Sequence, residues 1–232
     1  PYELQEVIEE RGKSWTLVLK PKDHDGISFN AGQVAWLTIG TSPFALRKHP
    51  FSITSSAEQS EHLMFTIREL GDFTSQIGQF SPGERAYIDG PYGTFDLDHH
   101  EASAYVLIAG GIGIAPMMSI MRTMADRGDS RPLILFYGSP TWNDVILREE
   151  IEQLEDELNL DVVHVLEHPP EGWEGEAGYI TADVLDRHLP EDRQRWTYFI
   201  CGPLPMINAV ESALETLAIP KKRMYIEEYE MA

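Results

Sequence analysis

The chain has 232 residues, enough for one large domain or two small ones, and 42% of them are hydrophobic, as is ordinary for globular proteins. Its 18 basic and 38 acidic residues give a net charge of −20, which argues against nucleic-acid binding and against charge-driven docking on an anionic membrane. The single cysteine excludes an intrachain disulfide, a cysteine-ligated zinc site and an iron–sulfur cluster, so redox chemistry needs an organic cofactor. The acidic surface either solvates the protein or attracts a basic partner.

Residues 2–88 alternate between apolar and polar side chains with a period of two, which predicts short β-strands separated by clusters of Gly, Pro, Asp and Ser. The predicted strands are Glu3–Glu9, Ser14–Leu19, Gln33–Ile39, Leu63–Ile67 and Arg85–Ile88. Short strands with little helix between them indicate a closed antiparallel barrel.

The segment His49–Ser55 is at once apolar and rich in hydroxyl groups. Pro50 fixes an extended bend, so Phe51 and Ser52 are expected to present an aromatic face beside a hydroxyl group. The alternative is an edge strand that simply begins at a proline.

The segment Glu69–Ile77 predicts a turn followed by a short helix. Gly71 and Asp72 form the turn, and Thr74 or Ser75 caps a helix whose N-terminus faces outward and can hold an anion. An ordinary capped helix between two strands is an equally good interpretation of this segment.

Beyond residue 100 the period changes, and apolar strands alternate with helices. The predicted strands are Tyr105–Ala109, Pro132–Tyr137, Asp161–Leu166, Thr197–Ile200 and Arg223–Ile226, and the predicted helices are Ile114–Arg127, Asn143–Leu158, Thr181–His188 and Pro205–Leu217. This alternation predicts a doubly wound parallel sheet. The expected fold is therefore an antiparallel β-barrel domain at residues 1–100, followed by an α/β domain at residues 101–232.

The run Tyr105–Ser119 reads as a buried strand, a glycine turn at Gly110, Gly111 and Gly113, and the start of a helix. Glycine lets an anion approach the backbone, and the helix directs its free N–H groups at that anion, so we expect a dinucleotide pyrophosphate here. Glycines at this position also occur purely for close packing. Pro116 stands where the usual dinucleotide motif has its third glycine, which disfavours a common Rossmann dehydrogenase.

The segment Cys201–Pro203 follows the fourth predicted parallel strand, at the carboxyl edge where such sheets bind ligands. A lone cysteine is most often a small buried hydrophobic residue, but this position favours a role in a site. The histidines are expected to be solvated, at strand ends or in loops, and to form no metal site: His99, His100, His164 and His168.

Six motifs in order along essentially the whole chain resemble the ferredoxin–NADP⁺ reductase superfamily. They are His49–Ser52, Gly71–Thr74, Asp89–Phe95, Gly110–Pro116, Cys201–Pro203 and an aromatic residue near the C-terminus, Tyr229. The histidine of His49–Ser52, in place of the usual arginine, looks like the NADPH oxidase and ferric reductase branch. The resemblance implies an FAD-binding barrel followed by a domain that binds NADH or NADPH.

The resemblance also implies roles for individual residues. Phe51 is expected against the flavin ring, Ser52 near its N5 atom, and His49 at the FAD pyrophosphate. The residues implied in FAD binding are His49, Pro50, Phe51, Ser52, Thr54, Ser55, Ile67, Arg68, Gly71, Asp72, Phe73, Thr74, Ser75 and Tyr229. Those implied in binding the nicotinamide dinucleotide are Gly110, Gly111, Gly113, Ile114, Pro116, Tyr137, Gly138, Ser139, Cys201, Gly202 and Pro203. The catalytic residues implied are Ser52, Cys201, Glu227 and Tyr229, with no metal.

The implied activity is hydride transfer from NAD(P)H to FAD, followed by release of single electrons to an acceptor. In the resembling branch the acceptor is the haem of an attached transmembrane domain, so we expect a cytoplasmic module at the inner face of a membrane. A chain that begins at Pro1, without an apolar span, is then the excised soluble part. No arginine follows Tyr137–Ser139, so the choice between NADH and NADPH stays open. The alternatives are a soluble reductase component that feeds a protein acceptor, and a redox-inert module that binds flavin or nucleotide for regulation.

Overall fold

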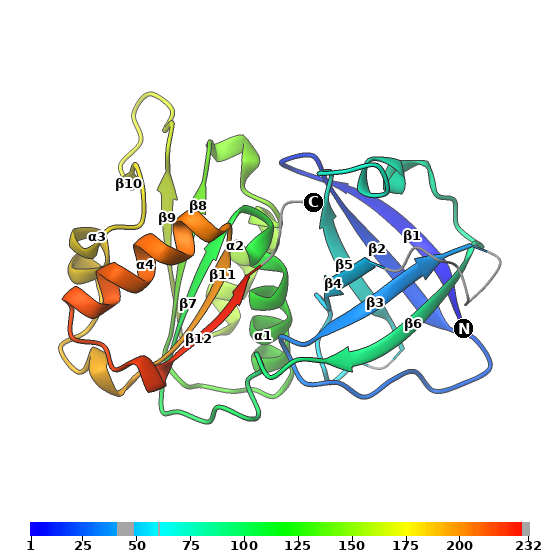
Figure 1. The fold of residues 1–232 in the computed structure, drawn as a ribbon, viewed down its shortest axis with the longest axis horizontal. Coiled ribbons are helices and arrows are strands. Elements are labelled where there is room, and N and C mark those ends of the chain that lie inside the picture. Colours follow the sequence, from blue (N-terminus) through cyan, green and yellow to red (C-terminus); the bar gives the residue numbers. More distant parts are fainter. Residues whose placement is uncertain (41–48, 60, 229–232) are drawn as a thin grey trace. The chain divides into compact units, whose positions relative to one another are not determined.

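The computed structural model describes residues 1–40, 49–59 and 61–228, and the chain divides into two units (Figure 1). The first, which we call the barrel unit, contains Pro1–His99 together with Ala115–Arg127. The second, the sheet unit, contains His100–Ile114 and the chain from Gly128 onward. The helix of Ala115–Arg127 thus belongs with the barrel, although the sequence places it within the second half of the chain.

The barrel unit is built on a six-stranded antiparallel sheet with the strand order β4-β3-β6-β1-β2-β5. Its strands are β1 (Tyr2–Glu10), β2 (Ser14–Pro21), β3 (Val34–Ile39), β4 (His49–Ser52), β5 (Leu63–Arg68) and β6 (Arg85–Tyr92). Alternate side chains point inward, as the period of two requires, and Leu4, Leu17 and Phe65 are fully buried in its core. The predicted barrel-like fold is confirmed.

The strands β4 and β5 are the two edges of this sheet, and the chain just beyond β4 links them. The amide of Thr54 donates to the carbonyl oxygen of Met64 at 2.8 Å, and the amide of Met64 donates to Ser55 Oγ at 3.1 Å. These bonds satisfy backbone groups that an open edge would leave exposed. The edge-strand interpretation of His49–Ser52 is therefore correct for the backbone of this segment.

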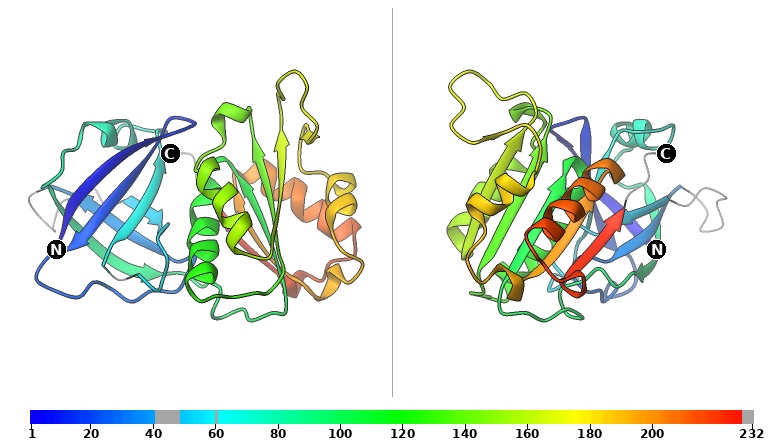
Figure 2. Two further views of the ribbon diagram at one scale, coloured as in Figure 1. Left: turned by 180° about the vertical axis from the view of Figure 1, so that it is seen from behind. Right: turned by 60° about the vertical axis from the view of Figure 1, so that its left-hand side comes forward.

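The sheet unit is built on a six-stranded parallel sheet with the strand order β10-β9-β8-β7-β11-β12. Its strands are β7 (Tyr105–Gly110), β8 (Leu133–Ser139), β9 (Leu160–Leu166), β10 (Glu176–Ala177), β11 (Thr197–Gly202) and β12 (Met224–Glu228). The helices α3 (Ala182–His188) and α4 (Leu204–Thr216) cover one face, and α2 (Arg148–Glu157) covers the other (Figure 2). The predicted doubly wound arrangement is confirmed.

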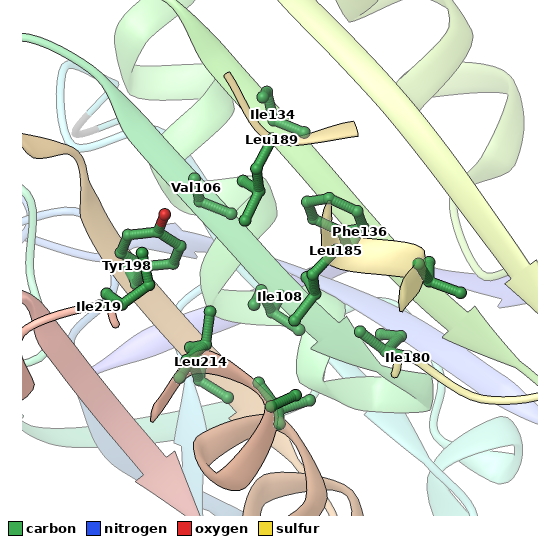
Figure 3. Packing of buried hydrophobic residues seen from close by; sticks show 14 of the residues in the cluster. Val106, Ile108, Ile134, Phe136, Ile180, Leu185, Leu189, Tyr198, Leu214 and Ile219 are labelled. Atoms are coloured by element: carbon green, nitrogen blue, oxygen red, sulfur yellow. The ribbon is translucent and has the colours of Figure 1, made fainter. Parts of the chain in front are cut away.

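A single apolar cluster holds α3 and α4 to the parallel sheet (Figure 3). Val106 and Ile108 of β7 meet Leu185 of α3 and Leu214 of α4, and all of these side chains are at least nine-tenths buried. Near-continuous apolar strands of this kind are expected where a parallel sheet is covered on both faces. This cluster fixes the strands whose carboxyl ends form the site described below.

In the sheet unit, the predicted helix Asn143–Leu158 and the strand β10 differ from the sequence prediction. The predicted helix Asn143–Leu158 is divided into a short helix η3 (Trp142–Asp144) and α2, because Leu147 adopts a left-handed backbone conformation with φ of 56°. The amide of Ile146 donates to the hydroxyl of Tyr137 at 3.2 Å, a bond that takes it out of the helix. The short strand β10 had no pattern that predicted it. None of the helices in the described part of the chain is long and apolar enough to cross a bilayer.

Candidate nucleotide-binding sites

The carboxyl ends of the central strands of the sheet unit lie at one edge, where the direction of strand succession reverses. Gly110 at the end of β7 is in register with Gly138 of β8, and Ala109 is in register with Cys201 of β11. Strands β8 and β9 lie on one side of β7, and β11 and β12 on the other. Such a switch point is the usual place for a ligand in an open parallel sheet.

The glycines of the turn after β7 are required by the backbone and by protein contacts. Gly111 has a φ of 52°, in the left-handed region that favours glycine. A side chain on Gly113 would overlap the carbonyl oxygen of Cys201, and one on Gly110 would overlap the side chain of Met206. Gly110 and Gly113 are therefore needed for close packing within the protein, in addition to the predicted approach of an anion.

The helix α1 (Ile114–Asp126) begins directly after this turn, which forms the short helix η2 (Gly111–Gly113). The first turn of α1 carries no acidic side chain, so nothing on the helix itself neutralises its positive dipole end. Pro116 lies within that first turn, where a missing N–H group costs little. A turn, a helix start and no competing carboxylate fit a pyrophosphate group.

Ser139, the last residue of β8, supplies an independent indication of a ligand. Its side chain is 2% exposed, and its Oγ atom has no hydrogen-bond partner among the residues that the structure describes. A buried hydroxyl left unpaired costs free energy, which a hydroxyl group of a bound ribose would recover. The neighbouring Tyr137 donates its hydroxyl to the carbonyl oxygen of Gly111 at 3.1 Å, which ties β8 to the glycine turn. The unpaired hydroxyl of Ser139 and the glycine turn together fit the ribose and the pyrophosphate of a dinucleotide.

Cys201 and Glu227 are cross-strand neighbours in the parallel pair of β11 and β12. Cys201 is 2% exposed, and burial, together with the nearby Glu227, raises the pKa of its thiol. Burial also raises the pKa of Glu227 to about 7. The thiol is therefore neutral, and the carboxyl group is partly protonated near neutral pH. The pair offers weakly polar groups of low charge at the ligand edge of the sheet.

Glu167 is a candidate residue that sequence reasoning missed. It follows the last residue of β9, and its amide donates to the carbonyl oxygen of Ser139 at 3.1 Å, which brings its backbone to the end of β8. Its exposed carboxylate accepts a hydrogen bond from the hydroxyl of Tyr179 at 3.4 Å. No acidic residue lies in β8, and the acid instead follows the next strand. Only the register between β8 and β9 reveals it.

In the barrel unit, the structure brings the two predicted flavin motifs together through their aromatic rings. The rings of His49 and Phe73 stack with centroids 4.2 Å apart and an angle of 12° between planes. Phe51 lies beside this pair, with its centroid 6.3 Å from those of both His49 and Phe73 and plane angles of 30° and 22°. Phe73 comes from a different segment of the chain than His49 and Phe51, which both belong to β4. Parallel aromatic faces fit a planar ring system.

The turn at Gly71–Ser75 differs from its prediction. Thr74 is already the first residue of the short helix η1 (Thr74–Gln79), and no side chain caps that helix. The hydroxyl of Thr74 instead accepts from the amides of Leu70 and Gly71 at 2.8 Å each, and Ser75 donates to the carbonyl oxygen of Asp72. The predicted cap is therefore wrong, because these hydroxyl groups stabilise the preceding turn. The expected role of the segment in FAD binding stays a prediction.

The remaining predicted FAD residues occupy different environments. Thr54, Ser55 and Ile67 are buried, and the hydroxyls of Thr54 and Ser55 accept from the amides of Thr66 and Met64. The hydroxyls of Thr54 and Ser55 thus hold the chain just after β4 to β5. The half-buried side chains are Phe51, Ser52, Arg68 and Phe73, while Pro50, Gly71 and Asp72 are exposed. Tyr229 lies outside the described residues.

His164 departs from the expectation of a solvated side chain. It lies within β9, packs edge-on against Trp142 with ring centroids 5.0 Å apart, and is half-buried. Burial, with a smaller contribution from Arg148, lowers the pKa of His164 to about 4, so the ring is neutral at physiological pH. The prediction for His164 is wrong because Trp142 packs against its ring, a contact between segments that the sequence pattern does not show.

Comparison with known proteins connects these two units to named domain families. Residues 16–96 match a family model described as an FAD-binding domain, and residues 107–212 match one described as an oxidoreductase NAD-binding domain. The fold is shared with the cytochrome b5 reductase domain of Ulva prolifera nitrate reductase, at a TM-score of 0.83 and 22% identity over 98% of this chain and 96% of that chain. The flavin motifs His49–Ser52 and Gly71–Thr74 thus lie within the FAD-binding match. The dinucleotide motifs Gly110–Pro116 and Cys201–Pro203 lie within the NAD-binding match.

Proteins related in sequence identify the family more specifically than the domain matches do. NADH-cytochrome b5 reductase 1 of Lodderomyces elongisporus is 33% identical over 73% of this chain and 58% of the relative. The enzyme of the same name from Scheffersomyces stipitis is 30% identical over 88% of this chain and 73% of the relative. The first curated relatives are matched over about three fifths of their own length. The chain therefore belongs to the cytochrome b5 reductase-like family of the ferredoxin-reductase-like superfamily.

Proposed function

We propose that this chain is an FAD-dependent NADH dehydrogenase module that delivers single electrons to a haem acceptor. The observation that carries the proposal is the carboxyl edge of the parallel sheet, where Gly110 is in register with Gly138 and Ala109 with Cys201, beside the unpaired hydroxyl of Ser139. FAD, when bound, supplies the conversion between two-electron and one-electron chemistry. The chain supplies binding, orientation and the exclusion of water.

In the barrel unit, the aromatic cluster of His49, Phe51 and Phe73 provides the surface for the flavin. Phe51 offers the ring face, and Ser52, the next residue, offers a hydroxyl group for the flavin N5 region. His49, held flat against Phe73, supports the FAD diphosphate together with the turn at Gly71. A histidine is a weaker anion ligand than the arginine found in most relatives of this fold, because arginine is always charged.

In the sheet unit, Cys201 and Glu227 position the nicotinamide without acting as strong acids or bases. Hydride transfer requires no proton transfer from the protein, so a neutral thiol is suitable beside the reacting carbon. Glu227 holds a proton on its carboxyl group in a fraction of molecules near neutral pH and can donate it to a carboxamide or flavin oxygen. Both groups keep the local charge low.

NADH is the proposed dinucleotide. A carboxylate at Glu167 accepts hydrogen bonds from the two hydroxyls of an adenosine ribose and repels a 2′-phosphate. Its backbone is bonded to Ser139, whose hydroxyl is available for the same sugar. The relatives named NADH-cytochrome b5 reductases support the same choice.

The acceptor is proposed to be the haem of a transmembrane domain of the NADPH oxidase and ferric reductase type, with this module at the cytoplasmic face of the membrane. Support comes from His49, which takes the arginine's place as in that branch, and from relatives that are named as reductases of a cytochrome. A soluble reductase component with a protein acceptor is the second candidate. The similarity in fold to the ferredoxin reductase in carbazole 1,9a-dioxygenase, at a TM-score of 0.83, favours it.

The test is an anaerobic stopped-flow titration of the FAD-reconstituted chain with NADH and NADPH in parallel, following the visible flavin absorbance. Rapid bleaching by NADH and slow bleaching by NADPH are expected. No bleaching by either nucleotide, with FAD demonstrably bound, contradicts the dehydrogenase function and favours a redox-inert module. A chain that binds no FAD contradicts the assignment of the barrel unit.

The acceptor is tested separately with the reduced protein. Mixing it anaerobically with a haem protein, a ferric chelate and a ferredoxin distinguishes the two candidates by rate. Preferential reduction of the ferredoxin contradicts the haem proposal and leaves the dehydrogenase activity standing.

A further inference from the structure

The helix α1 connects the two nucleotide sites in an unexpected way. It begins at the glycine turn of the sheet unit, yet Ala115–Arg127 belongs to the barrel unit. Its side chains are buried almost all round from Ile114 to Met124, as expected for a helix that is apolar on every side. Polar residues within this helix are therefore unusual and call for partners.

Three polar side chains of α1 bond to the backbone of Thr54–Ala57. Ser119 Oγ donates to the carbonyl oxygen of Ser55 at 2.8 Å, and the amide of Ala57 donates to Thr123 Oγ1 at 2.9 Å. Arg122 Nη1 donates to the carbonyl oxygen of Thr54 at 2.6 Å. Ser119 and Thr123 are fully buried, so water does not compete with these bonds.

The segment that receives these bonds follows directly on His49–Ser52, the motif that supplies two rings of the aromatic cluster. It is also tied to β5, through the bonds that Thr54 and Ser55 make to Met64. At the other end of the helix, Arg127 pairs with Glu58 and Asp98 at 2.6 Å each. The helix is therefore bonded to the barrel along its length, while its first turn belongs to the dinucleotide cradle.

We propose that Ser119, Arg122 and Thr123 are positioning residues that couple the flavin site to the dinucleotide site through α1. The inference rests on the proposed function, because it requires that both nucleotides bind. Flavin bound at His49–Ser52 restrains Thr54–Ala57, which restrains α1 and prearranges the helix start that holds the pyrophosphate. The second nucleotide then has to order less of the protein when it binds. Each ligand therefore strengthens the binding of the other by the same factor.

The decisive measurement is the affinity of the flavin-free chain for NAD⁺, compared with its affinity in saturating oxidised FAD, by titration calorimetry. No electron transfer occurs between NAD⁺ and oxidised FAD, so binding alone is measured. For the wild type, FAD is expected to tighten NAD⁺ binding by about fivefold or more. In the double variant Ser119→Ala and Thr123→Val, which nearly keeps side-chain volume, this factor is expected to fall towards one with NAD⁺ affinity of the flavin-free chain unchanged.

The chain contains a matched control on α4, which lies wholly in the sheet unit. Ser212 and Thr216 have the same spacing as Ser119 and Thr123, and Thr216 donates to the carbonyl oxygen of Ser212 at 2.9 Å, as Thr123 does to that of Ser119 at 2.7 Å. Both hydroxyls of the control pair bond only within their own helix in the contacts described. The variant Ser212→Ala with Thr216→Val should therefore keep the wild-type coupling factor.

A second measurement applies if the double variant does not fold. Arg122→Lys keeps the charge and loses the planar donor that reaches Thr54, so the coupling factor should again fall. Hydrogen exchange provides a readout in the same samples: FAD should slow amide exchange in α1 of the wild type, and this protection should be lost in the Arg122→Lys variant while protection of β4 remains. An unchanged coupling factor in the variants, or a factor of one in a wild type that binds both ligands, overturns the inference and leaves the proposed function intact. A wild type that binds neither ligand overturns both.

Discussion

The turns at Gly110–Gly113 and at Gly71–Thr74 each lead into a helix, and they are built in opposite ways. The turn at Gly110–Gly113 is packed within the sheet unit, where the carbonyl of Cys201 and the side chain of Met206 occupy the space that side chains would need. The turn at Gly71–Thr74 is largely exposed, and the hydroxyl of Thr74 holds it together by bonding backward along the chain. Tertiary packing fixes the first turn, whereas local hydrogen bonds fix the second.

The difference has an energetic consequence. A change in the packed turn disturbs neighbouring strands and should cost stability as well as ligand affinity. A change in the exposed turn, or in the aromatic cluster beside it, should alter affinity for the cofactor and leave the free energy of unfolding nearly unchanged. Similar motifs therefore predict different mutational phenotypes.

The largest effect on stability is expected for Gly113→Ala, in the packed turn. The new methyl group would overlap the backbone oxygen of Cys201, which cannot move without disturbing β11, so we expect a loss of about 4 kcal/mol in the free energy of unfolding. Urea denaturation measures it. Gly138→Ala is the control, because the nearest atom to its methyl group would be a side-chain carbon of Ile180 at 3.5 Å, an ordinary contact. Equal stability of the two variants would contradict the packed-turn interpretation.

The second prediction concerns pH. Because burial raises the pKa of Glu227 from 4.5 to about 7, the folded state binds this proton more tightly than the unfolded state does. The associated stability is fully present below pH 4.5 and is lost as the pH rises through 7, by about 3 kcal/mol. Denaturation of wild type and Glu227→Gln across this range isolates the contribution, since glutamine does not titrate. Parallel curves for the two proteins would show that Glu227 is charged in the folded state.

Selectivity between dinucleotides tests a smaller effect at the same edge. Glu167→Gln removes the carboxylate that is proposed to repel a 2′-phosphate, so the preference for NADH over NADPH should fall about tenfold, or about 1.4 kcal/mol. The measurement is the ratio of kcat/KM values for the two nucleotides. Glu174→Gln removes an exposed carboxylate from the following loop and should leave the ratio unchanged. A fall of the same size in both variants would indicate a general charge effect.

The smallest predicted effect lies in the barrel unit. His49→Arg places a permanent charge where the ring of His49 now stacks on Phe73, and a guanidinium group can stack in the same way. We expect FAD to bind about fivefold more tightly, equivalent to about 1 kcal/mol, with little change in thermal stability. Fluorescence titration of the flavin-free protein measures this affinity. Weaker binding in the variant would show that His49 contributes through its ring shape instead of its charge.

Most of the architecture was accessible from the sequence because both halves of the chain have strong periodic patterns. The period of two in residues 2–88 and the alternation of strands and helices beyond residue 100 follow directly from which faces must be buried. Helix α2 was predicted too long because hydrophobic periodicity does not indicate the left-handed backbone of Leu147. Nor does it indicate that the hydroxyl of Tyr137 accepts a hydrogen bond from the amide of Ile146. Both depend on contacts outside the segment.

The sequence by itself determined the order of the two nucleotide-binding units and the segments that carry their motifs, since local composition and turn chemistry specify these. The tertiary structure alone decided which motif residues meet: the stack of His49 on Phe73, the pairing of Cys201 with Glu227, and the position of Glu167 at the end of β8. It also decided that α1 belongs to the barrel unit. These features arise from strand register and from buried hydrogen bonds between distant segments, and neither leaves a periodic signal in the sequence.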